Sequence, residues 1–206
     1  RELSPADGLI SGIGTVNAAQ FGAQASRCMA LAYDYTVFAG TQGMMNHKKT
    51  DRMLGLAEQW RLPLVLFAEG GGGRPGDSDF VGVAGLDCHT FVGMAKLSGL
   101  VPLVGVVSGR CFAGNAALLG CCDVIIAAQD ASIGMAGPAM IEGGGLGRFS
   151  AEQVGPVSVQ GPNGVIDLQV ADEAAAVAAA KRYLGYFQGP LPADAPAGGD
   201  ALSLRL

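Results

Sequence analysis

Two glycine-rich turns are the parts of this sequence best suited to chemistry. The first, within residues 67–79, reads F-A-E-G-G-G-G-R-P-G-D-S-D and follows the apolar run 62–67. The second, residues 108–115, reads S-G-R-C-F-A-G-N and follows the apolar run 101–107. Glycine lets the backbone approach a ligand closely. We expect the two turns to form a pair of backbone N–H donor sites that face one cleft, where such donors stabilise a developing oxygen anion.

Other interpretations of these turns explain less of the sequence. Gly71, Gly73 and Gly76 match the dinucleotide fingerprint G-x-G-x-x-G, but Pro75 interrupts it and the next apolar run ends without an acidic residue for a ribose. No Gly-Lys-Ser/Thr follows, so a phosphate-binding P-loop is not indicated. Ser108 and His89 lack the G-x-S-x-G elbow of a serine hydrolase. A plain tight turn remains the structural alternative.

Basic side chains lie near the first turn. A cluster opens the helix expected before it: His47, Lys48, Lys49 and Arg52. It is either a solvated helix end or a docking site for a phosphate-bearing ligand. Arg74, next to the glycines, either contacts the ligand or anchors the loop through Asp77 or Asp79.

The apolar pattern around the turns predicts an α/β protein with crossover connections. We expect strands at residues 8–17, 29–39, 62–67, 101–107, 123–127, 132–135 and 164–170. A helix led by His47 should bury Met53, Leu54 and Trp60 and end before Pro63. Further helices are expected at residues 86–97, 115–120 and 173–187, the last capped by Asp172. Residues 1–187 then form one domain, and residues 188–206 a linker-like tail toward a second half.

The composition of the chain limits the kinds of partner that we expect it to bind. The chain has 206 residues, half of them apolar, and a formal net charge of −5 without long basic runs, so we expect no nucleic-acid partner. No apolar run reaches the roughly 18 residues of a membrane span. The five cysteines are expected to be buried and reduced, and the two histidines are not at ligand spacing with them, so we expect no metal and a cytoplasmic location.

The residues of the two turns resemble a known family. E-G-G-G-G-R-P-G-D, preceded by L-P-L-V-L-F and followed by S-G-R-C-F-A-G-N-A-A-L-L-G-C-C-D-V-I-I-A, resembles the carboxyltransferase half of biotin-dependent acyl-CoA carboxylases, a branch of the crotonase-like superfamily. The resemblance extends over residues 8–190. It implies a crotonase-like ββα superhelix in an oligomeric enzyme that binds acyl-CoA mostly in this N-terminal half.

The resemblance also implies partners and residue roles. Carboxybiotin, on a biotin carboxyl carrier domain and charged by biotin carboxylase, comes from the related C-terminal half, usually of a second subunit. Two oxyanion holes stabilise the enolate and the biotin anion, and the biotin anion can serve as the base. Which hole serves which substrate stays open. The implied donors are Gly72, Gly73, Gly114 and Asn115, and the implied substrate-binding residues are Gly71, Arg74, Lys48, Lys49 and Ala113.

Two alternatives remain open. An enoyl-CoA hydratase or isomerase would need two glutamates, at the positions of Ala117 and near Gly137, with Glu142 the nearest acidic residue but offset. Without its biotin half, the chain could instead be an acyl-CoA-binding or assembly module.

Overall fold

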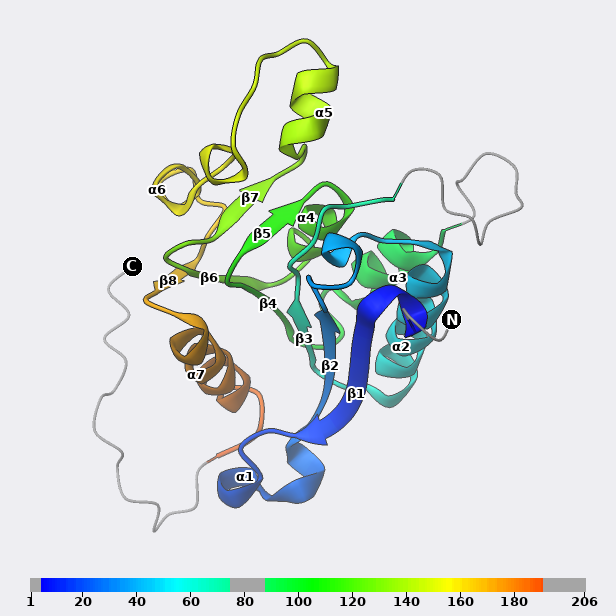
Figure 1. Ribbon diagram of the computed structural model, residues 1–206. Helices are drawn as coiled ribbons and strands as arrows, with labels where there is room; N and C mark the ends of the chain where they lie inside the picture. The colour runs from blue at the N-terminus through cyan, green and yellow to red at the C-terminus, as the bar shows by residue number, and fades with distance from the viewer. Residues whose placement is uncertain (1–4, 75–87, 191–206) are drawn as a thin grey trace.

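The computed structural model describes residues 5–74 and 88–190, and its centre is a twisted sheet of six strands within those residues (Figure 1). The strand order is β1-β2-β3-β4-β6-β8. Only β1 runs antiparallel to its neighbour, and the other pairs are parallel. The strands are β1 (Leu9–Thr15), β2 (Arg27–Tyr33), β3 (Leu64–Phe67), β4 (Leu103–Val107), β6 (Val124–Ala128) and β8 (Leu168–Val170). The predicted α/β class with crossovers is confirmed.

Helices cover both faces of the sheet because the central strands are apolar on both sides. On one face lie α2 (Met44–Trp60) and α3 (Thr90–Leu97), and on the other lies α7 (Glu173–Gly185) (Figure 1). Alternate strand residues point to opposite faces. Leu64 and Leu66 therefore join the core under α2 and α3, while Val104 and Val106 join the core under α7.

A second, two-stranded parallel sheet pairs β5 (Arg110–Phe112) with β7 (Ser132–Gly134). Around it lie the short helices α4 (Gly114–Leu119), α5 (Pro138–Gly143) and α6 (Val157–Gln160), with the 3-10 turn η3 (Ala151–Gln153). Figure 1 shows α5 projecting from the body beyond this small sheet. The remaining elements are η1 (Pro5–Gly8), α1 (Ala18–Ala25) and η2 (Phe38–Gly40). No helix within the described residues is long and apolar enough to cross a bilayer.

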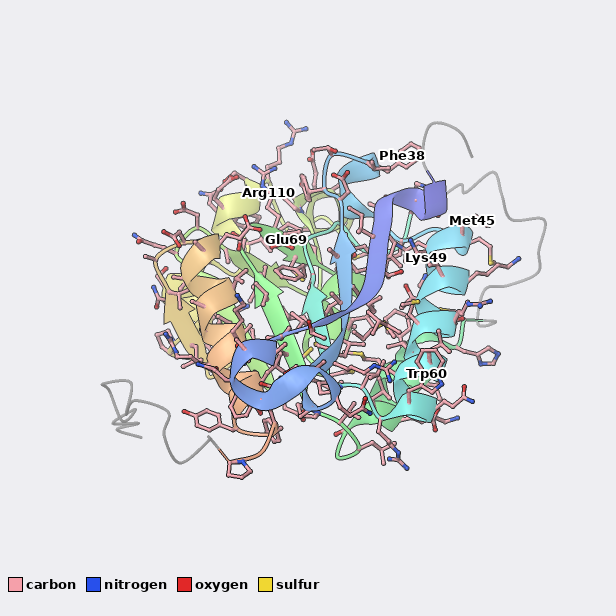
Figure 2. All side chains as sticks on the ribbon, turned by 90° about the horizontal axis from the view of Figure 1, so that it is seen from below. Phe38, Met45, Lys49, Trp60, Glu69 and Arg110 are labelled. Atoms are coloured by element: carbon pink, nitrogen blue, oxygen red, sulfur yellow. The ribbon has the colours of Figure 1, made fainter. Side chains whose placement is uncertain are left out.

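The structure corrects several expected boundaries. Strand β2 ends at Tyr33 rather than at residue 39, because the chain turns at Asp34, whose carbonyl accepts from the Val37 N–H at 3.0 Å, and then enters η2. The helix expected from residue 86 begins at Thr90, and residues 75–87 lie outside the described part of the chain. Trp60 is 46% exposed, with the Arg27 guanidinium 5.7 Å from its ring, so it does not belong to the core. Figure 2 shows it at the far end of α2 from Met45.

Candidate active site

The first glycine bend, Gly70–Gly73, follows β3 and is bonded to the segments on either side of it. The Gly70 N–H donates to Arg110 O at 2.8 Å, and the Phe112 N–H donates back to Gly70 O at 2.8 Å. The Gly71 N–H donates to Ala39 O at 3.1 Å. The bend is thus held between η2 and β5, two segments that are distant from it in the sequence.

The second glycine bend joins β5 to α4 through Ala113. This residue has φ 51° and ψ −119°, a conformation that is rare for a residue with a Cβ atom. Its N–H donates to Gly134 O at 2.9 Å, and its carbonyl accepts from the Ala117 N–H at 2.8 Å to open α4. The strained turn therefore places the first amides of α4, those of Gly114 and Asn115, at the bend.

The two bends are in contact. Gly72 has φ +85°, and a Cβ atom built on it would lie 2.4 Å from Ala113 Cβ and 3.1 Å from Gly114 N. The Gly72 N–H donates to Asn115 Oδ1 at 2.9 Å. Only glycine fits at position 72, both for its backbone angle and for the space between the bends. The two turns therefore lie against each other, while the expectation that they face one cleft as donor sites stays a prediction.

The backbone amides of the two bends differ in whether they donate to an acceptor within the protein. Those of Gly70, Gly71 and Gly72 already donate within the protein. The amides of Gly73, Gly114 and Asn115 donate no hydrogen bond to another group among residues 5–74 and 88–190. Gly72, expected as a donor to the ligand, gives its N–H to Asn115 Oδ1, and Gly71, expected to bind substrate, gives its N–H to Ala39 O.

Asn115 has a role that the sequence reasoning did not include. Its side chain is fully buried and its Nδ2 lies 3.4 Å from both Gly40 O and Glu69 O, while Oδ1 accepts from Gly72. A Cβ atom on Gly70 would lie 2.3 Å from that Nδ2. The amide side chain thus joins η2, the first bend and α4.

Gln42 completes the site, and sequence reasoning missed it. Its backbone bridges the first bend, accepting from the Arg74 N–H at 2.9 Å and donating to Gly72 O at 2.7 Å. Its side chain is buried against the second bend, since a Cβ on Gly114 would lie 2.2 Å from Gln42 Oε1. The only signal in the sequence was the pair of polar residues, Thr41 and Gln42, between Gly40 and Gly43.

The basic residues make contacts of their own. Arg74 pairs with Asp7 at 3.1 Å and lies 4.7 Å from the centroid of the Phe38 ring. Its observed anchor is therefore Asp7, while Asp77 and Asp79 lie outside the described residues. Lys49 donates from Nζ to Leu9 O at 2.6 Å, which ties α2 to β1, as Figure 2 indicates. Lys48 is exposed.

A partly buried carboxylate lies next to the first bend but lines a different space. Glu69 accepts the Ser108 N–H at 2.5 Å, and burial raises the pKa of its carboxyl. It lines an open cavity of about 600 Å³ together with residues that include Phe67, Arg110 and Glu173 at the start of α7. Figure 2 shows Glu69 and Arg110 close together on that side. Gly72, Gly73 and Gly114 do not line this cavity.

Comparisons with known proteins point to one family. A family model described as "Carboxyl transferase domain" matches residues 1–198. The uncharacterized carboxylase YngE of Bacillus subtilis is 29% identical over 93% of this chain and 37% of its own length. The biotin-dependent long chain acyl-coenzyme A carboxylase beta4 subunit of Mycobacterium tuberculosis is 28% identical over 88% and 33%. The chain thus spans about a third of the curated relatives it matches.

Solved structures share the fold. A single-chain, multi-domain long-chain acyl-CoA carboxylase is 64% identical, with a TM-score of 0.86, over 91% of this chain and 18% of that one. The transcarboxylase 12S subunit is 26% identical, with a TM-score of 0.72, over 88% and 34%. These neighbours are carboxyltransferases of the crotonase-like fold, which confirms the predicted fold class.

Proposed function

The chain belongs to the carboxyl transferase domain family, and on that premise we propose that it is the acyl-CoA half of a biotin-dependent carboxyltransferase. The reaction moves a carboxyl group from carboxybiotin to the α-carbon of an acyl-CoA. The observation that carries the proposal is the contact between the two glycine bends, with the amides of Gly73 and Gly114 not bonded within the described residues. The 64% identical neighbour makes long-chain acyl-CoA the first substrate class to test.

The chemistry assigned to this chain is electrostatic. When the α-carbon loses its proton, negative charge develops on the thioester oxygen, and backbone N–H groups placed there lower the barrier by several kcal/mol. Gly73 and Gly114 are the proposed donors, with the Asn115 amide beside them at the start of α4. Gly72, Ala113, Gln42 and the Asn115 side chain position the donors.

Basic side chains near the bends are proposed to bind the coenzyme A part of the substrate or to support the site. Lys48, exposed on α2, is the proposed contact for the phosphates of coenzyme A. Lys49 and Arg74 support the site through Leu9 and Asp7, which hold α2 and the first bend in place. Biotin supplies the carboxyl group. In this proposal the enzyme is a cytoplasmic oligomer, and other parts of it hold the biotin carrier domain, the biotin carboxylase and the C-terminal carboxyltransferase half.

Gly73→Ala is the direct test. Among residues 5–74 and 88–190, a Cβ atom on Gly73 meets nothing within 4 Å, and φ is not positive, so the methyl group enters space that these residues leave open beside the proposed donors. In the full-length protein assembled with its biotin partners, the added methyl group should keep the substrate oxygen away from the Gly73 N–H. Formation of carboxylated acyl-CoA should then fall about 100-fold, the size of effect expected when one oxyanion donor no longer acts.

Gly12→Ala is the matched control for that test. Gly12 lies in β1, and a Cβ atom there also meets open space. The Gly12→Ala enzyme should therefore form carboxylated acyl-CoA at the wild-type rate. A Gly73→Ala enzyme as fast as the Gly12→Ala enzyme would contradict the assignment. Acyl-CoA binding without any carboxylated product in the wild type would favour the binding-module alternative.

The hydratase alternative has little support in the site. Ala117 occupies one glutamate position within α4, and Gly137 the other. Glu142, the nearest acidic residue in sequence, is half exposed and pairs with Arg148 at 2.6 Å. No water-adding activity on an enoyl-CoA is therefore expected from the wild-type protein.

A further inference from the structure

Strand β1 lies at one edge of the main sheet (Figure 1). It pairs with β2 on one side, and no strand of the described residues pairs with its other side. Most of the strand is exposed, and its two isoleucines, Ile10 and Ile13, are 62% and 39% exposed. An edge strand presents a row of unpaired N–H and C=O groups, which another strand can satisfy. The outer edge of β1 is therefore a candidate interaction surface.

The pairing with β2 decides which residues of β1 point outward. Gly8 O accepts at 3.0 Å from the residue that follows β2, and the Val16 N–H donates at 2.8 Å to the residue that precedes it. The even-numbered residues thus turn their backbone groups toward β2, and the odd-numbered residues turn theirs away from it. Leu9 agrees with this alternation, because its carbonyl accepts from Lys49 Nζ instead of from β2.

The remaining odd-numbered residues, Ser11, Ile13 and Thr15, therefore hold their N–H and C=O groups at the open edge. Sheets commonly protect such an edge with charged side chains, proline or a bulge. The sequence L-I-S-G-I-G-T of β1 contains no charge and no proline, and its register with β2 runs without a bulge. Nothing in the strand itself blocks the approach of another strand.

We propose that the outer edge of β1 pairs with β1 of a second copy of this chain, antiparallel and around a twofold axis at Ile13. In this register Ile13 faces Ile13 of the second copy, and Ser11 of each copy faces Thr15 of the other. Every N–H and C=O of these three residues gains a partner. The two main sheets become one continuous sheet.

The side chains of β1 favour a second copy as the partner. The exposed Ile13 would pack on its own counterpart, and the Ser11–Thr15 pairs join hydroxyl side chains, which are favourable cross-strand neighbours. No charged side chains would face each other across the axis. Gly12 would face Gly14 of the second copy, so the methyl group of Gly12→Ala has room there.

The bond from Lys49 selects the register. A shift of the partner strand that placed Ser11 opposite Ile13 would extend the pairing to Leu9 and would need its carbonyl, which Lys49 already occupies. The register centred on Ile13 uses only the groups that are free of such bonds within the described residues. The pairing involves neither glycine bend, and it does not depend on the proposed carboxyl transfer.

Ile13→Cys in the full-length protein tests this register by disulfide cross-linking. Residues opposite each other in a hydrogen-bonded antiparallel pair have Cα atoms about 5.5 Å apart, within the range that a disulfide spans. With a mild oxidant we expect a disulfide between two copies at position 13. Two of the five native cysteines, Cys28 and Cys111, are buried and the other three are partly exposed, so peptide mass mapping must locate each disulfide.

Ser11→Cys is the matched control for the cross-linking. Position 11 of each copy would face position 15 of the other, so the two residues at position 11 lie about 14 Å apart, too far for a disulfide. A mixture of Ser11→Cys and Thr15→Cys proteins should cross-link between those two positions. Absence of the disulfide at position 13, or equal cross-linking of Ser11→Cys alone, would overturn the proposal.

Ile13→Lys tests whether the edge contributes to association. It places two like charges opposite each other at the axis, and we expect the association of the full-length protein, followed by sedimentation equilibrium, to weaken about tenfold. Leu100→Lys makes the same kind of change at a residue that is 40% exposed outside β1, and it should leave association unchanged. Far-ultraviolet circular dichroism checks that both variants are folded. Equal association of the two variants, or a wild-type protein that does not associate, would refute the pairing.

Discussion

At the scale of single residues, neighbouring glycines have different reasons to be glycine. Gly72 needs its positive φ and the space beside Ala113, and Gly114 packs on the Gln42 side chain. Gly73 is limited by neither angle nor packing among the described residues. A substitution at Gly72 or Gly114 therefore tests folding together with function, while one at Gly73 isolates the proposed chemistry.

The carboxyl of Glu69 gives a residue-scale prediction about pH. Burial raises its pKa above the usual 4.5, so the protonated form stabilises the folded state, and this contribution is lost as pH rises through the folded pKa. Glu69→Gln keeps an acceptor for the Ser108 N–H but removes the buried charge. We expect the variant to gain stability relative to wild type on going from pH 4 to about pH 7. Urea unfolding at both pH values measures the change.

Glu58→Gln, on the exposed surface of α2, is the control for the pH experiment. Its stability relative to wild type should change little between the two pH values. The interpretation of Glu69 is wrong if both variants show the same dependence on pH.

At the scale of elements, local sequence signals determine where some helices begin. Asp172 precedes α7, and its side chain accepts the Ala175 N–H at 2.8 Å, as the sequence predicted. The buried face of α7 is mostly alanine, with Leu184, and packs on the strands of the second core. The cap sets where this alanine-rich face begins.

Removing that cap should destabilise the protein modestly. Asp172→Ala leaves the Ala175 N–H without its side-chain acceptor, and we expect a loss of about 1 kcal/mol in the free energy of unfolding. Asp130→Ala changes an exposed aspartate in a turn and serves as the control. Denaturant titration of both variants measures the difference. Equal stabilities would show that the Asp172 cap does not stabilise α7.

At the scale of the whole molecule, polar groups far apart in the sequence hold the site together. Asn115 in α4 contacts Gly40, Glu69 and Gly72 across separations of 75, 46 and 43 residues. Asp7 reaches Arg74 across 67 residues. The donors are therefore positioned by tertiary contacts rather than by the glycine turns alone.

Asn115→Leu tests this long-range clamp with a side chain of similar size. Three buried groups, Gly72 N–H, Gly40 O and Glu69 O, lose their partner, and each unsatisfied buried group costs about 1–3 kcal/mol. We expect a large fall in the free energy of unfolding, measured in urea. Asn163→Leu, at an exposed position after α6, should be nearly neutral. A neutral Asn115→Leu would show that the bends hold their positions without the clamp.

Much of the fold could be predicted because it depends on neighbours in the chain. The apolar runs predicted β3, β4 and β6 to within two residues, and Pro63 correctly indicated the end of α2. Strand β5 was missed because it is three residues long and pairs with β7 rather than with the main sheet. Helix α5 was missed because proline and glycines indicate a loop there.

The sequence by itself determined the class of the fold and the two glycine bends, because apolar periodicity and the absence of side chains act locally. Only the tertiary structure decided which amides of the described residues stay unbonded within them, and that Gln42 and Asn115 support the bends. Those contacts join residues about 30 to 75 positions apart. Their partners are selected by the packing of the whole sheet and its helices, and no local pattern in the sequence encodes them.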